Sequence, residues 1–196
     1  MNRNELIADI EKLWFNKGHL NETERDFMID LFLKHKPSNC LEIGFATGRS
    51  AVTALIAAKP TRLVSIEINL DYMGARSYAN NLLASFPNYQ IYEGDSKALL
   101  TSKFFKDCFP DNLDFVFVDG GHSYVDAYTD IKNVYPYLNV GGLIVVDDYK
   151  SGPPEGCPIP EVDKAVEDFH VEHKDTMEIS SWYDNGKGCA ILKRIK

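Results

Sequence analysis

The chain has 196 residues, of which 44% are hydrophobic and 26% are charged, and its formal net charge is −8. This composition is typical of a globular protein that can bury a full hydrophobic core. The sequence contains no basic run, which argues against nucleic acid as a partner because phosphate binding depends on clustered Lys and Arg. No apolar run approaches the roughly 20 residues that span a bilayer, and the polar N-terminus lacks the apolar core of a signal peptide. We therefore expect a cytoplasmic protein that binds neither nucleic acid nor membrane.

Two amphipathic helices are predicted at the N-terminus. Apolar residues recur at helical spacing over residues 4–15, and a turn at Gly18-His19 follows. Asn21 and Glu24 then form a capping-box pattern at the start of a second helix, and Pro37 ends that helix. We expect the two helices to cover the cofactor side or to shape a substrate entrance; simple packing against the edge of the sheet is the alternative.

From residue 39 onward, short apolar strands alternate with helices. The predicted strands are residues 40–44, 63–67, 90–93, 113–119, 143–147, 177–182 and 188–193, and four of the helices between them are residues 71–85, 96–105, 125–135 and 161–173. Such alternation is typical of a parallel sheet with helices on both faces. Asn185-Gly186 is a hairpin signal that makes the last two strands antiparallel. We predict one α/β domain over residues 1–196, with a helical extension (1–37) and a core (38–196).

A glycine-containing turn follows the first predicted strand. Residues 39–50 have the order strand, turn and helix start, which places the turn and the helix N-terminus against a ligand at the strand end. The turn, residues 44–48, lacks the complete dinucleotide fingerprint because Ala46 stands where the middle glycine would be. Glu67 follows about 20 residues after the turn, where a carboxylate accepts hydrogen bonds from a ribose diol and disfavours a 2′-phosphate. The pattern predicts a nucleoside cofactor other than NADP.

Carboxylates lie at or near the end of every predicted parallel strand. They are Glu42, Glu67, Asp95, Asp119, Asp147 and Asp148. Ligands of open parallel sheets bind outside these strand ends, although any single Asp can instead serve a turn or a cap. Asp95 and Ser96 are placed to meet an adenine edge. If strands four and five are neighbours, Asp119, Asp147 and Asp148 lie together, and three acids suit a divalent cation, best Mg²⁺, with Mn²⁺ and Ca²⁺ as options.

Residues 41–50 resemble the first motif of class I S-adenosylmethionine-dependent methyltransferases. The closest variant is that of the small metal-dependent O-methyltransferases, which tolerate a non-glycine at the middle position. Glu67 and the segments 94–96, 115–122 and 141–148 match the family in order, so the resemblance covers residues 39–193. It implies a doubly wound, Rossmann-like, mostly parallel seven-stranded sheet that ends in the predicted hairpin. It also implies S-adenosylmethionine contacts from Glu42, Gly44, Phe45, Thr47, Gly48, Ser50, Glu67, Asp95, Ser96 and Asp119.

The same resemblance implies the metal and catalytic residues. Metal-dependent relatives use an Asp after the fourth strand and an acidic pair after the fifth, which are Asp119, Asp147 and Asp148 here. The catechol type has a catalytic Lys three residues after the first ligand, where this chain has His122. That difference argues against a catechol-like substrate. Asp119 and His122 are the candidate catalytic residues, since a His with an ordinary pKa of about 6.5 can take a hydroxyl proton at neutral pH; a capping or packing role is the alternative for His122.

Three functions remain open from the sequence. The first is an S-adenosylmethionine-dependent methyltransferase that acts on a hydroxyl of a small molecule with help from a divalent metal. The second is a metal-independent N- or O-methyltransferase. The third is a nicotinamide-dependent oxidoreductase, against which the missing glycine and the acidic cluster count. The expected partner is a small-molecule methyl acceptor, selected by the N-terminal helices, the Pro-rich 150–160 loop, Tyr124 and Tyr149, and a homodimer is an option.

Overall fold

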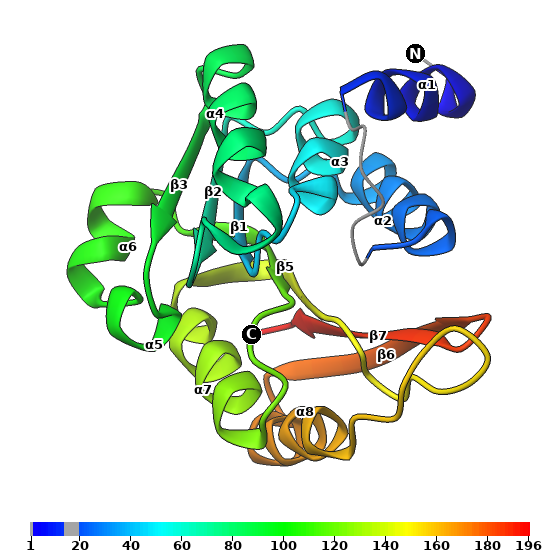
Figure 1. Cartoon of the computed structure of the whole chain (residues 1–196). Helices are drawn as coiled ribbons and strands as arrows, with labels where there is room; N and C mark the ends of the chain where they lie inside the picture. The colour runs from blue at the N-terminus through cyan, green and yellow to red at the C-terminus, as the bar shows by residue number, and fades with distance from the viewer. Residues whose placement is uncertain (1, 14–19) are drawn as a thin grey trace.

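The centre of the fold is a seven-stranded sheet in the order β3-β2-β1-β4-β5-β7-β6 (Figure 1). The computed structural model describes residues 2–13 and 20–196. The strands are β1 (Asn39–Ile43), β2 (Arg62–Glu67), β3 (Tyr89–Glu93), β4 (Leu113–Val118), β5 (Leu138–Val146), β6 (Met177–Asp184) and β7 (Lys187–Arg194). The pairs from β3 to β5 are parallel, whereas β7 runs antiparallel to both β5 and β6. This confirms the predicted mostly parallel sheet with a C-terminal hairpin.

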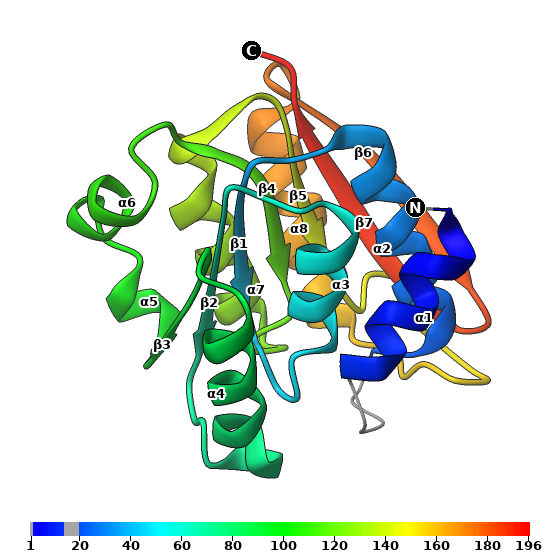
Figure 2. The ribbon, with the colours of Figure 1, turned by 90° about the horizontal axis from the view of Figure 1, so that it is seen from above.

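Helices cover both faces of this sheet. They are α1 (Arg3–Leu13), α2 (Glu22–His35), α3 (Arg49–Ala57), α4 (Ala75–Ser85), α5 (Ser96–Leu99), α6 (Ser102–Cys108), α7 (Tyr124–Val134) and α8 (Pro160–His173). The helices α1 to α4 share one hydrophobic core with the sheet, and α6, α7 and α8 share the other. The two groups lie on opposite sides of the strands (Figure 1, Figure 2). The arrangement is the predicted doubly wound one.

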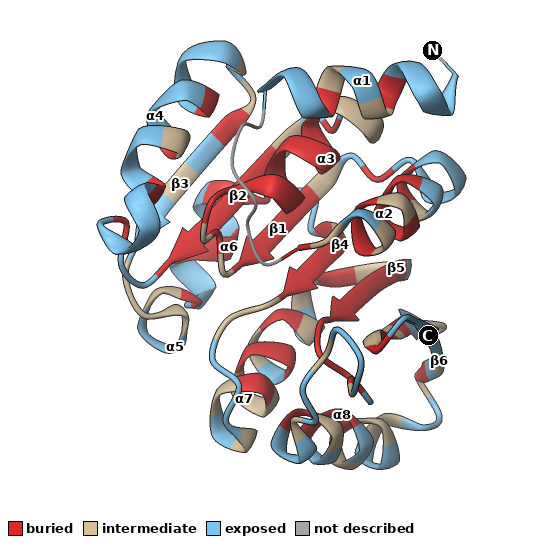
Figure 3. Ribbon diagram, turned by 45° about the vertical axis from the view of Figure 1, so that its right-hand side comes forward, coloured by how far each residue is buried: buried red, intermediate tan, exposed pale blue. Residues whose placement is uncertain are grey.

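Burial follows from this layering. Figure 3 shows β1, β2 and β4 buried along nearly their whole length and the exposed residues mostly on the outer faces of the helices. Leu41, Val64, Val116 and Ile144 are each at most 1% exposed, as expected for parallel strands that are covered on both faces. Within residues 2–13 and 20–196, no helix has the length and apolarity that a bilayer crossing requires.

Three elements differ from the sequence prediction by more than a shift of one or two residues at an end. The predicted helix 71–85 begins as a separate 3₁₀ turn, η1 (Tyr72–Gly74), because Met73 has a φ of 49°. The predicted helix 96–105 is two helices, and Asp95 rather than Ser96 caps the first, accepting from the Lys97 N–H at 2.9 Å. Finally, β5 begins at Leu138, earlier than predicted, because the strand continues through Gly141-Gly142 with a register shift against β4.

The N-terminal helices pack on a sheet face and also reach the site. The predicted capping box is confirmed: the Asn21 side chain accepts from the Glu24 N–H, and the Glu24 side chain accepts from the Asn21 N–H. Phe27 of α2 stacks on Trp182 of β6 with ring centroids 4.6 Å apart. The predicted turn at Gly18-His19 and the last residues of the first helix lie outside the described residues. The start of α2 also contacts the loop that follows β5, because Asn21 Nδ2 donates to Glu155 Oε2 at 2.8 Å.

Candidate active site

The strand register brings the predicted site residues to one edge of the sheet. Ile43 pairs with Ile66 and Val118, and Val118 pairs with Val146. The residues that follow these strands therefore meet, and a cavity of about 500 Å³ lies there. Its wall runs from Gly94, Asp95, Ser96 and Lys97 past Glu67 and Gly44 to Asp119, His122, Asp147, Asp148 and Lys187. The predicted crevice at the carboxyl ends of the strands is thus a single continuous cavity.

The glycine turn is held in place by Glu67. Gly44 has a φ of +92°, and a Cβ there would lie 1.8 Å from the backbone oxygen of Asp119, so only glycine fits. Ala46 adopts a φ of 45°, a left-handed conformation that favours glycine. The carboxylate of Glu67 accepts hydrogen bonds from the Phe45 and Ala46 N–H groups, both at 2.9 Å. Glu67 also lines the cavity, as expected for a carboxylate that binds the hydroxyl groups of a ribose. The same side chain therefore stabilises the turn.

Glu42 lies beneath the turn and does not line the cavity. Its two oxygens accept hydrogen bonds from Ser50 Oγ and Ser65 Oγ, both at 2.5 Å. Burial raises the pKa of Glu42 to about 8, and the nearby carboxylates of Asp119 and Glu67 contribute to the rise. The carboxyl group is therefore protonated at neutral pH and links β1, β2 and α3.

Three further residues of the turn face the protein interior. Phe45 is 2% exposed and packs so closely on Gly48 that a Cβ there would lie 2.5 Å from the Phe45 ring. Thr47 is also 2% exposed. Of the ten residues predicted to contact the cofactor, Gly44, Glu67, Asp95, Ser96 and Asp119 line the cavity, whereas Glu42, Phe45, Thr47, Gly48 and Ser50 are not part of its wall. For the second group, direct contact with the cofactor stays a prediction.

The cavity wall beside Gly120 contains an acid that sequence reasoning missed. Asp130 of α7 is 1% exposed and accepts a hydrogen bond from Ser96 Oγ at 2.6 Å. Burial raises the pKa of Asp130 to about 6. Its position beside Ile131 on the apolar face of α7 was the available signal, because an acid on a buried helix face requires a partner.

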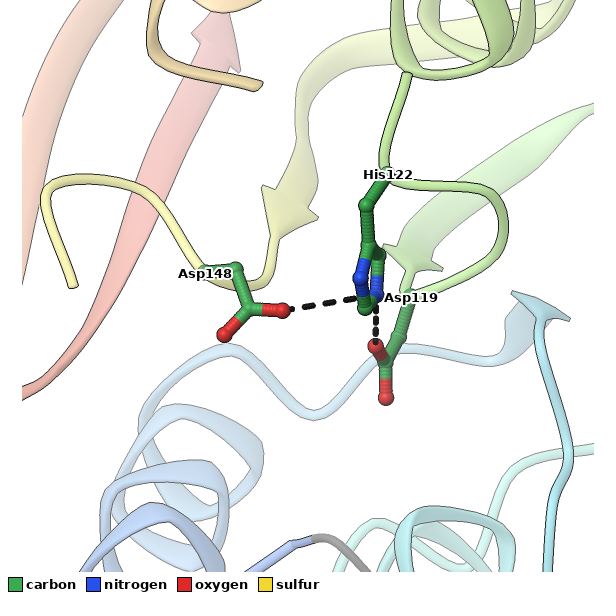
Figure 4. Close-up of side chains that lie close together, drawn as sticks. All are labelled: Asp119, His122 and Asp148. Carbon is green, nitrogen blue, oxygen red and sulfur yellow. Dashed lines mark ion pairs between the residues drawn. The ribbon is translucent and has the colours of Figure 1, made fainter. Parts of the chain in front are cut away.

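The opposite end holds a cluster of Asp119, His122 and Asp148 (Figure 4). Figure 4 shows the imidazole of His122 between the two carboxylates, with Nε2 at 3.9 Å from Asp119 Oδ1 and 3.4 Å from Asp148 Oδ2. One potential ligand atom from each residue lies within 4.8 Å of the others. The nearby carboxylate of Asp119 raises the pKa of His122, and the charge of Asp148 adds to this effect. Burial raises the pKa of Asp119, and the nearby His122 partly offsets this rise.

This donor set fits a divalent cation. Two carboxylates that lie close together repel each other, and a bound cation offsets this repulsion. Carboxylate oxygens and imidazole nitrogens are also common ligands of first-row metals. Asp148 lies in the loop after β5 and has a φ of 60°, an unfavourable backbone conformation. In this conformation its side chain lies beside His122. Asp119 and Asp148 are therefore the residues that would hold a metal here, and His122 is either a third ligand or a base beside them.

Asp147 is placed differently from its neighbour. Its side chain is buried, lines the same cavity and accepts a hydrogen bond from Cys189 Sγ at 3.1 Å. Burial and the nearby charge of Asp119 raise the pKa of Asp147 well above its usual range. The structure thus brings together only Asp119 and Asp148 of the three predicted metal ligands, with His122 as the third member. Asp147 as a ligand stays a prediction.

A buried ion pair, also missed from the sequence, borders the acidic end. Lys187 Nζ lies 3.5 Å from Glu24 Oε1, and the two side chains are 16% and 1% exposed. Burial lowers the pKa of Lys187, but the carboxylates of Glu24, Asp147 and Asp148 outweigh this and raise it overall. Lys187 is therefore a permanent cation in the cavity wall. The position of Lys187 directly after the Asn185-Gly186 turn gave no sign of this partner.

The Pro-rich segment after β5 is an ordered loop, as predicted. Gly152 N donates to Gly186 O at 2.7 Å, and Glu155 N donates to Asn185 O at 3.3 Å. These bonds attach the loop to the β6–β7 turn, and the Asn21–Glu155 hydrogen bond attaches it to α2. Three segments that are distant in sequence therefore contact one another next to Lys187, the residue after the β6–β7 turn that lines the cavity.

The two aromatic residues expected to select the acceptor are not in the cavity wall. The Tyr124 hydroxyl donates to Asp168 at 3.0 Å, and the Tyr149 hydroxyl donates to Glu167 at 3.5 Å. Both acceptors belong to α8, so these tyrosines join α7 and the loop to α8. That expectation was wrong, because α8 supplies polar partners that draw the rings away from the cavity. Tyr72, beside Glu67, is the tyrosine that lines it.

Comparison with known proteins identifies the family. The family described as the methyltransferase domain matches residues 41–149, which is more than half of the chain. The chain belongs to this family, and the resemblance to class I S-adenosylmethionine-dependent methyltransferases is confirmed. Family membership also favours methyl transfer over the nicotinamide alternative.

Solved structures share the fold over nearly the whole chain. The chain is similar to the O-methyltransferase from Bacillus cereus in complex with SAH, with a TM-score of 0.71, 16% identity, and coverage of 98% of this chain and 90% of that one. It is equally similar to the O-methyltransferase TomG from Streptomyces achromogenes, solved in complex with SAM, with a TM-score of 0.70, 18% identity, and coverage of 100% and 92%. At these identities the likeness establishes the fold.

One relative is similar in sequence. The uncharacterized protein R132 of Acanthamoeba polyphaga mimivirus is 33% identical over 84 residues, which is 42% of this chain and 38% of that protein. The match therefore spans little more than a third of the length of this relative.

Proposed function

We propose that the protein is an S-adenosylmethionine-dependent methyltransferase that transfers a methyl group to a hydroxyl of a small molecule, assisted by a divalent metal. The observation that carries this proposal is the continuous cavity with two different ends. One end has Glu67, Asp95 and Ser96, which suit a nucleoside, and the other has Asp119, His122 and Asp148, which suit a cation and an acceptor oxygen. The SAH- and SAM-bound O-methyltransferases with the same fold support it.

Methyl transfer is an in-line displacement at the sulfonium, so the protein must align the acceptor oxygen with the methyl group and remove the hydroxyl proton. In the proposed mechanism, Gly44 and Glu67 fix the nucleoside and so place the reactive end beside Asp119. His122 Nε2 takes the hydroxyl proton, because it is the basic atom on the exposed side of the cluster, with a side chain that is 53% exposed. The carboxylates of Asp119 and Asp148 stabilise the imidazolium that forms.

Asp119 and Asp148 are the residues that would hold the metal in this mechanism, with Mg²⁺ or Mn²⁺ favoured by the carboxylates. His122 is kept as the base, because a ring nitrogen that bound the metal could not also take the proton. When bound, such a cation supplies positive charge that lowers the pKa of the acceptor hydroxyl. Asp147 is a further candidate ligand from the sequence, and a change of its side-chain rotamer would be required to free it from Cys189.

A metal-independent methyltransferase is the second candidate, and one observation favours it. The acidic end already contains Lys187, a cation beside Glu24, and His122, whose pKa is raised by Asp119 and Asp148. Lys187, and His122 when it is protonated, neutralise part of the carboxylate charge without a metal. In this alternative, Lys187 and His122 orient the acceptor.

The deciding experiment measures methyl transfer from labelled S-adenosylmethionine to phenolic, sugar and amine acceptors, each with Mg²⁺ and with EDTA. We expect turnover of a hydroxylated acceptor that EDTA suppresses and that Asp148→Asn suppresses in the same way. Turnover that is unaffected by EDTA would transfer support to the metal-independent alternative. Calorimetry with S-adenosylmethionine and NAD is the accompanying binding test, and binding of NAD alone would contradict both candidates.

The remaining assignments are part of the same proposal. The partner is a small-molecule methyl acceptor, and the wall that selects it consists of the start of α2, the loop after β5 and the β6–β7 turn. A cytoplasmic location, a homodimer, and the absence of a nucleic-acid or membrane partner stay predictions from the sequence.

A further inference from the structure

A second concave surface lies at the amino end of the paired part of β5, away from the cavity at the strand ends. Leu143 of β5 pairs with Lys193 of β7, and both line this groove, whose volume is about 570 Å³. Asp147, which follows the carboxyl end of β5, lines the cavity instead, and no described residue belongs to both walls. Volumes of several hundred Å³ are typical of sites for small molecules. The groove is therefore a candidate binding site that is separate from the cavity.

The groove combines an apolar lining with basic side chains, and we call it the basic groove. Its apolar residues are buried or half-buried, and they are Leu31, Leu143, Met177, Ile179 and Ile191. Its basic residues come from α2, from the end of α8 and from β7, and they are Lys34, His35, His170, Lys174 and Lys193. Glu178 of β6 is the one acidic residue in the described wall. The basic side chains gather here although the chain as a whole has a formal net charge of −8.

The lysines of the basic groove have no counter-ions within the protein. Elsewhere on the surface a lysine pairs with an acid of its own helix, as Lys164 does with Asp168. In the part of the chain that the structure describes, Lys34, Lys174 and Lys193 form no such ion pair. Their charges repel one another, and a bound anion would relieve this repulsion.

His35 shows how close these charges lie. Partial burial lowers the pKa of His35, and the charges of Lys34 and Lys193 lower it further. Two lysines from different elements, α2 and β7, thus lie near enough to disfavour a proton on one imidazole. A bound anion would oppose this effect, because nearby negative charge favours the protonated imidazole.

Helix dipoles account for only part of this arrangement. Lys34, His35 and His170 lie in the last turns of α2 and α8, where basic residues interact favourably with the helix dipole. Lys193 belongs to a strand, where no such dipole acts, and it nevertheless lines the same groove. The convergence of basic side chains from three elements is therefore what indicates a ligand.

We propose that the basic groove binds a small molecule that carries a phosphate group and an apolar group. Lysine ammonium groups are compact charges that bind phosphate, and a phosphate monoester has nearly two negative charges at neutral pH. Lys174 and Lys193 supply the charge for the phosphate, and the apolar lining suits the remainder of the molecule. The site does not depend on methyl transfer, since its wall is separate from that of the cavity.

The test is calorimetric titration of the whole chain with phenyl phosphate and with inorganic phosphate at constant ionic strength. We expect phenyl phosphate to bind at one site, about ten-fold more tightly than inorganic phosphate, because the ring buries apolar surface. The double variant Lys174→Gln/Lys193→Gln should bind phenyl phosphate at least about ten-fold more weakly, because two charged contacts are lost. The control Lys59→Gln/Lys106→Gln removes the same charge from exposed lysines outside the groove and should bind like the wild type.

Nuclear magnetic resonance locates the ligand. Phenyl phosphate should shift the imidazole signals of His35 and His170 and leave that of His122 in the cavity unchanged. A shift of the His122 signal alone would place the ligand in the cavity and overturn the proposal.

Three calorimetric results would also overturn it. They are the absence of saturable phenyl phosphate binding to the wild type, full binding by the folded Lys174→Gln/Lys193→Gln variant, and equal weakening in the control, which would indicate a general attraction of anions. Equal affinity for the two ligands would contradict the role of the apolar lining. If circular dichroism shows that the double variant is unfolded, the single variant Lys193→Gln replaces it, and unweakened binding by that variant is then the contradicting result.

Discussion

Glu67 Oε2 accepts a hydrogen bond from the Ala46 N–H at 2.9 Å, so the carboxylate at the end of β2 fixes the residue that departs from the glycine pattern. Ala46 has a φ of 45°, a conformation that costs an L-amino acid roughly 1–2 kcal/mol. The hydrogen bonds to Glu67 offset this cost. The carboxylate expected from the sequence as a ribose ligand therefore has a second task, which is to maintain the turn.

The first prediction concerns this turn. Ala46→Gly should raise the free energy of unfolding by up to about 1 kcal/mol, because glycine adopts the positive φ without strain. The gain is smaller than the full strain energy because glycine loses more backbone entropy on folding than alanine does. Glu67→Gln should lower it by about 1–3 kcal/mol and weaken S-adenosylhomocysteine binding, because one acceptor oxygen is lost. Urea denaturation and calorimetry measure these changes, with Glu178→Gln on exposed β6 as the control. A destabilised Ala46→Gly variant would contradict the account.

The second prediction separates the two acids after β5. Asp148→Asn and Asp119→Asn should each lower Mn²⁺ affinity by at least about ten-fold, whereas Asp147→Asn should change it less, because Asp147 is bonded to Cys189. Calorimetric titration with Mn²⁺ in the presence of S-adenosylhomocysteine measures the affinities. If Asp147→Asn lowered the Mn²⁺ affinity most, Asp147 would be a metal ligand, as the sequence predicts. Its hydrogen bond with Cys189 would then be broken when the metal binds.

The third prediction concerns pH. Glu42 has a pKa of about 8 in the folded protein against an ordinary value of 4.5, so between these values the folded state binds more protons than the unfolded state. Its contribution to stability is therefore complete below pH 4.5 and is lost as the pH rises through about 8. The loss is limited to about 1.4 kcal/mol for each pH unit.

Glu42→Gln removes this titration and keeps an amide that can bond Ser50 and Ser65. We expect the free energy of unfolding of the variant to fall less steeply than that of the wild type between pH 5 and 8, a window of about three units within the interval set by the Glu42 pKa. Urea denaturation at several pH values is the measurement. Parallel profiles for the two proteins would show that Glu42 does not titrate in this range.

The fourth prediction tests the buried ion pair. Lys187→Met leaves Glu24 buried without a counter-charge and should cost about 3 kcal/mol at neutral pH. Adding Glu24→Gln should recover part of this loss, because the uncompensated charge is removed. Thermal and urea unfolding of the two single variants and the double variant give the coupling. Simple additivity of the two losses would show that the pair is not coupled.

The sequence predicted the nucleoside end of the site better than the acidic end. Glu67, Asp95 and Ser96 could be placed because they follow parallel strands, and the carboxyl ends of such strands always meet. Residue identity alone does not specify rotamers, so nothing distinguished Asp147, bonded to Cys189, from Asp148 beside His122. The internal role of Phe45 and Thr47 was hidden for the same reason.

Contacts between distant segments could not be predicted. Lys187 meets Glu24 only because the β6–β7 turn lies beside the start of α2, and no spacing rule relates a hairpin to an N-terminal helix. The departure of Tyr124 and Tyr149 from the cavity depended likewise on polar partners that α8 supplies. Local patterns such as the Asn21 capping box and the Asn185-Gly186 turn were predictable because their energetics involve only neighbours in sequence.

The attachment of the loop after β5 to the β6–β7 turn and to Asn21 has a consequence for how specificity can change. The end of the cavity with Glu67, Asp95 and Ser96 is assembled from strand ends and helices between Gly44 and Asp130, while Lys187 at the other end pairs with Glu24 of α2. If the proposed function holds, insertions or exchanges in the three mutually attached segments can shift Lys187 and the acceptor end while the strand ends keep their geometry. The fold separates the part that must stay constant from the part that is free to diverge.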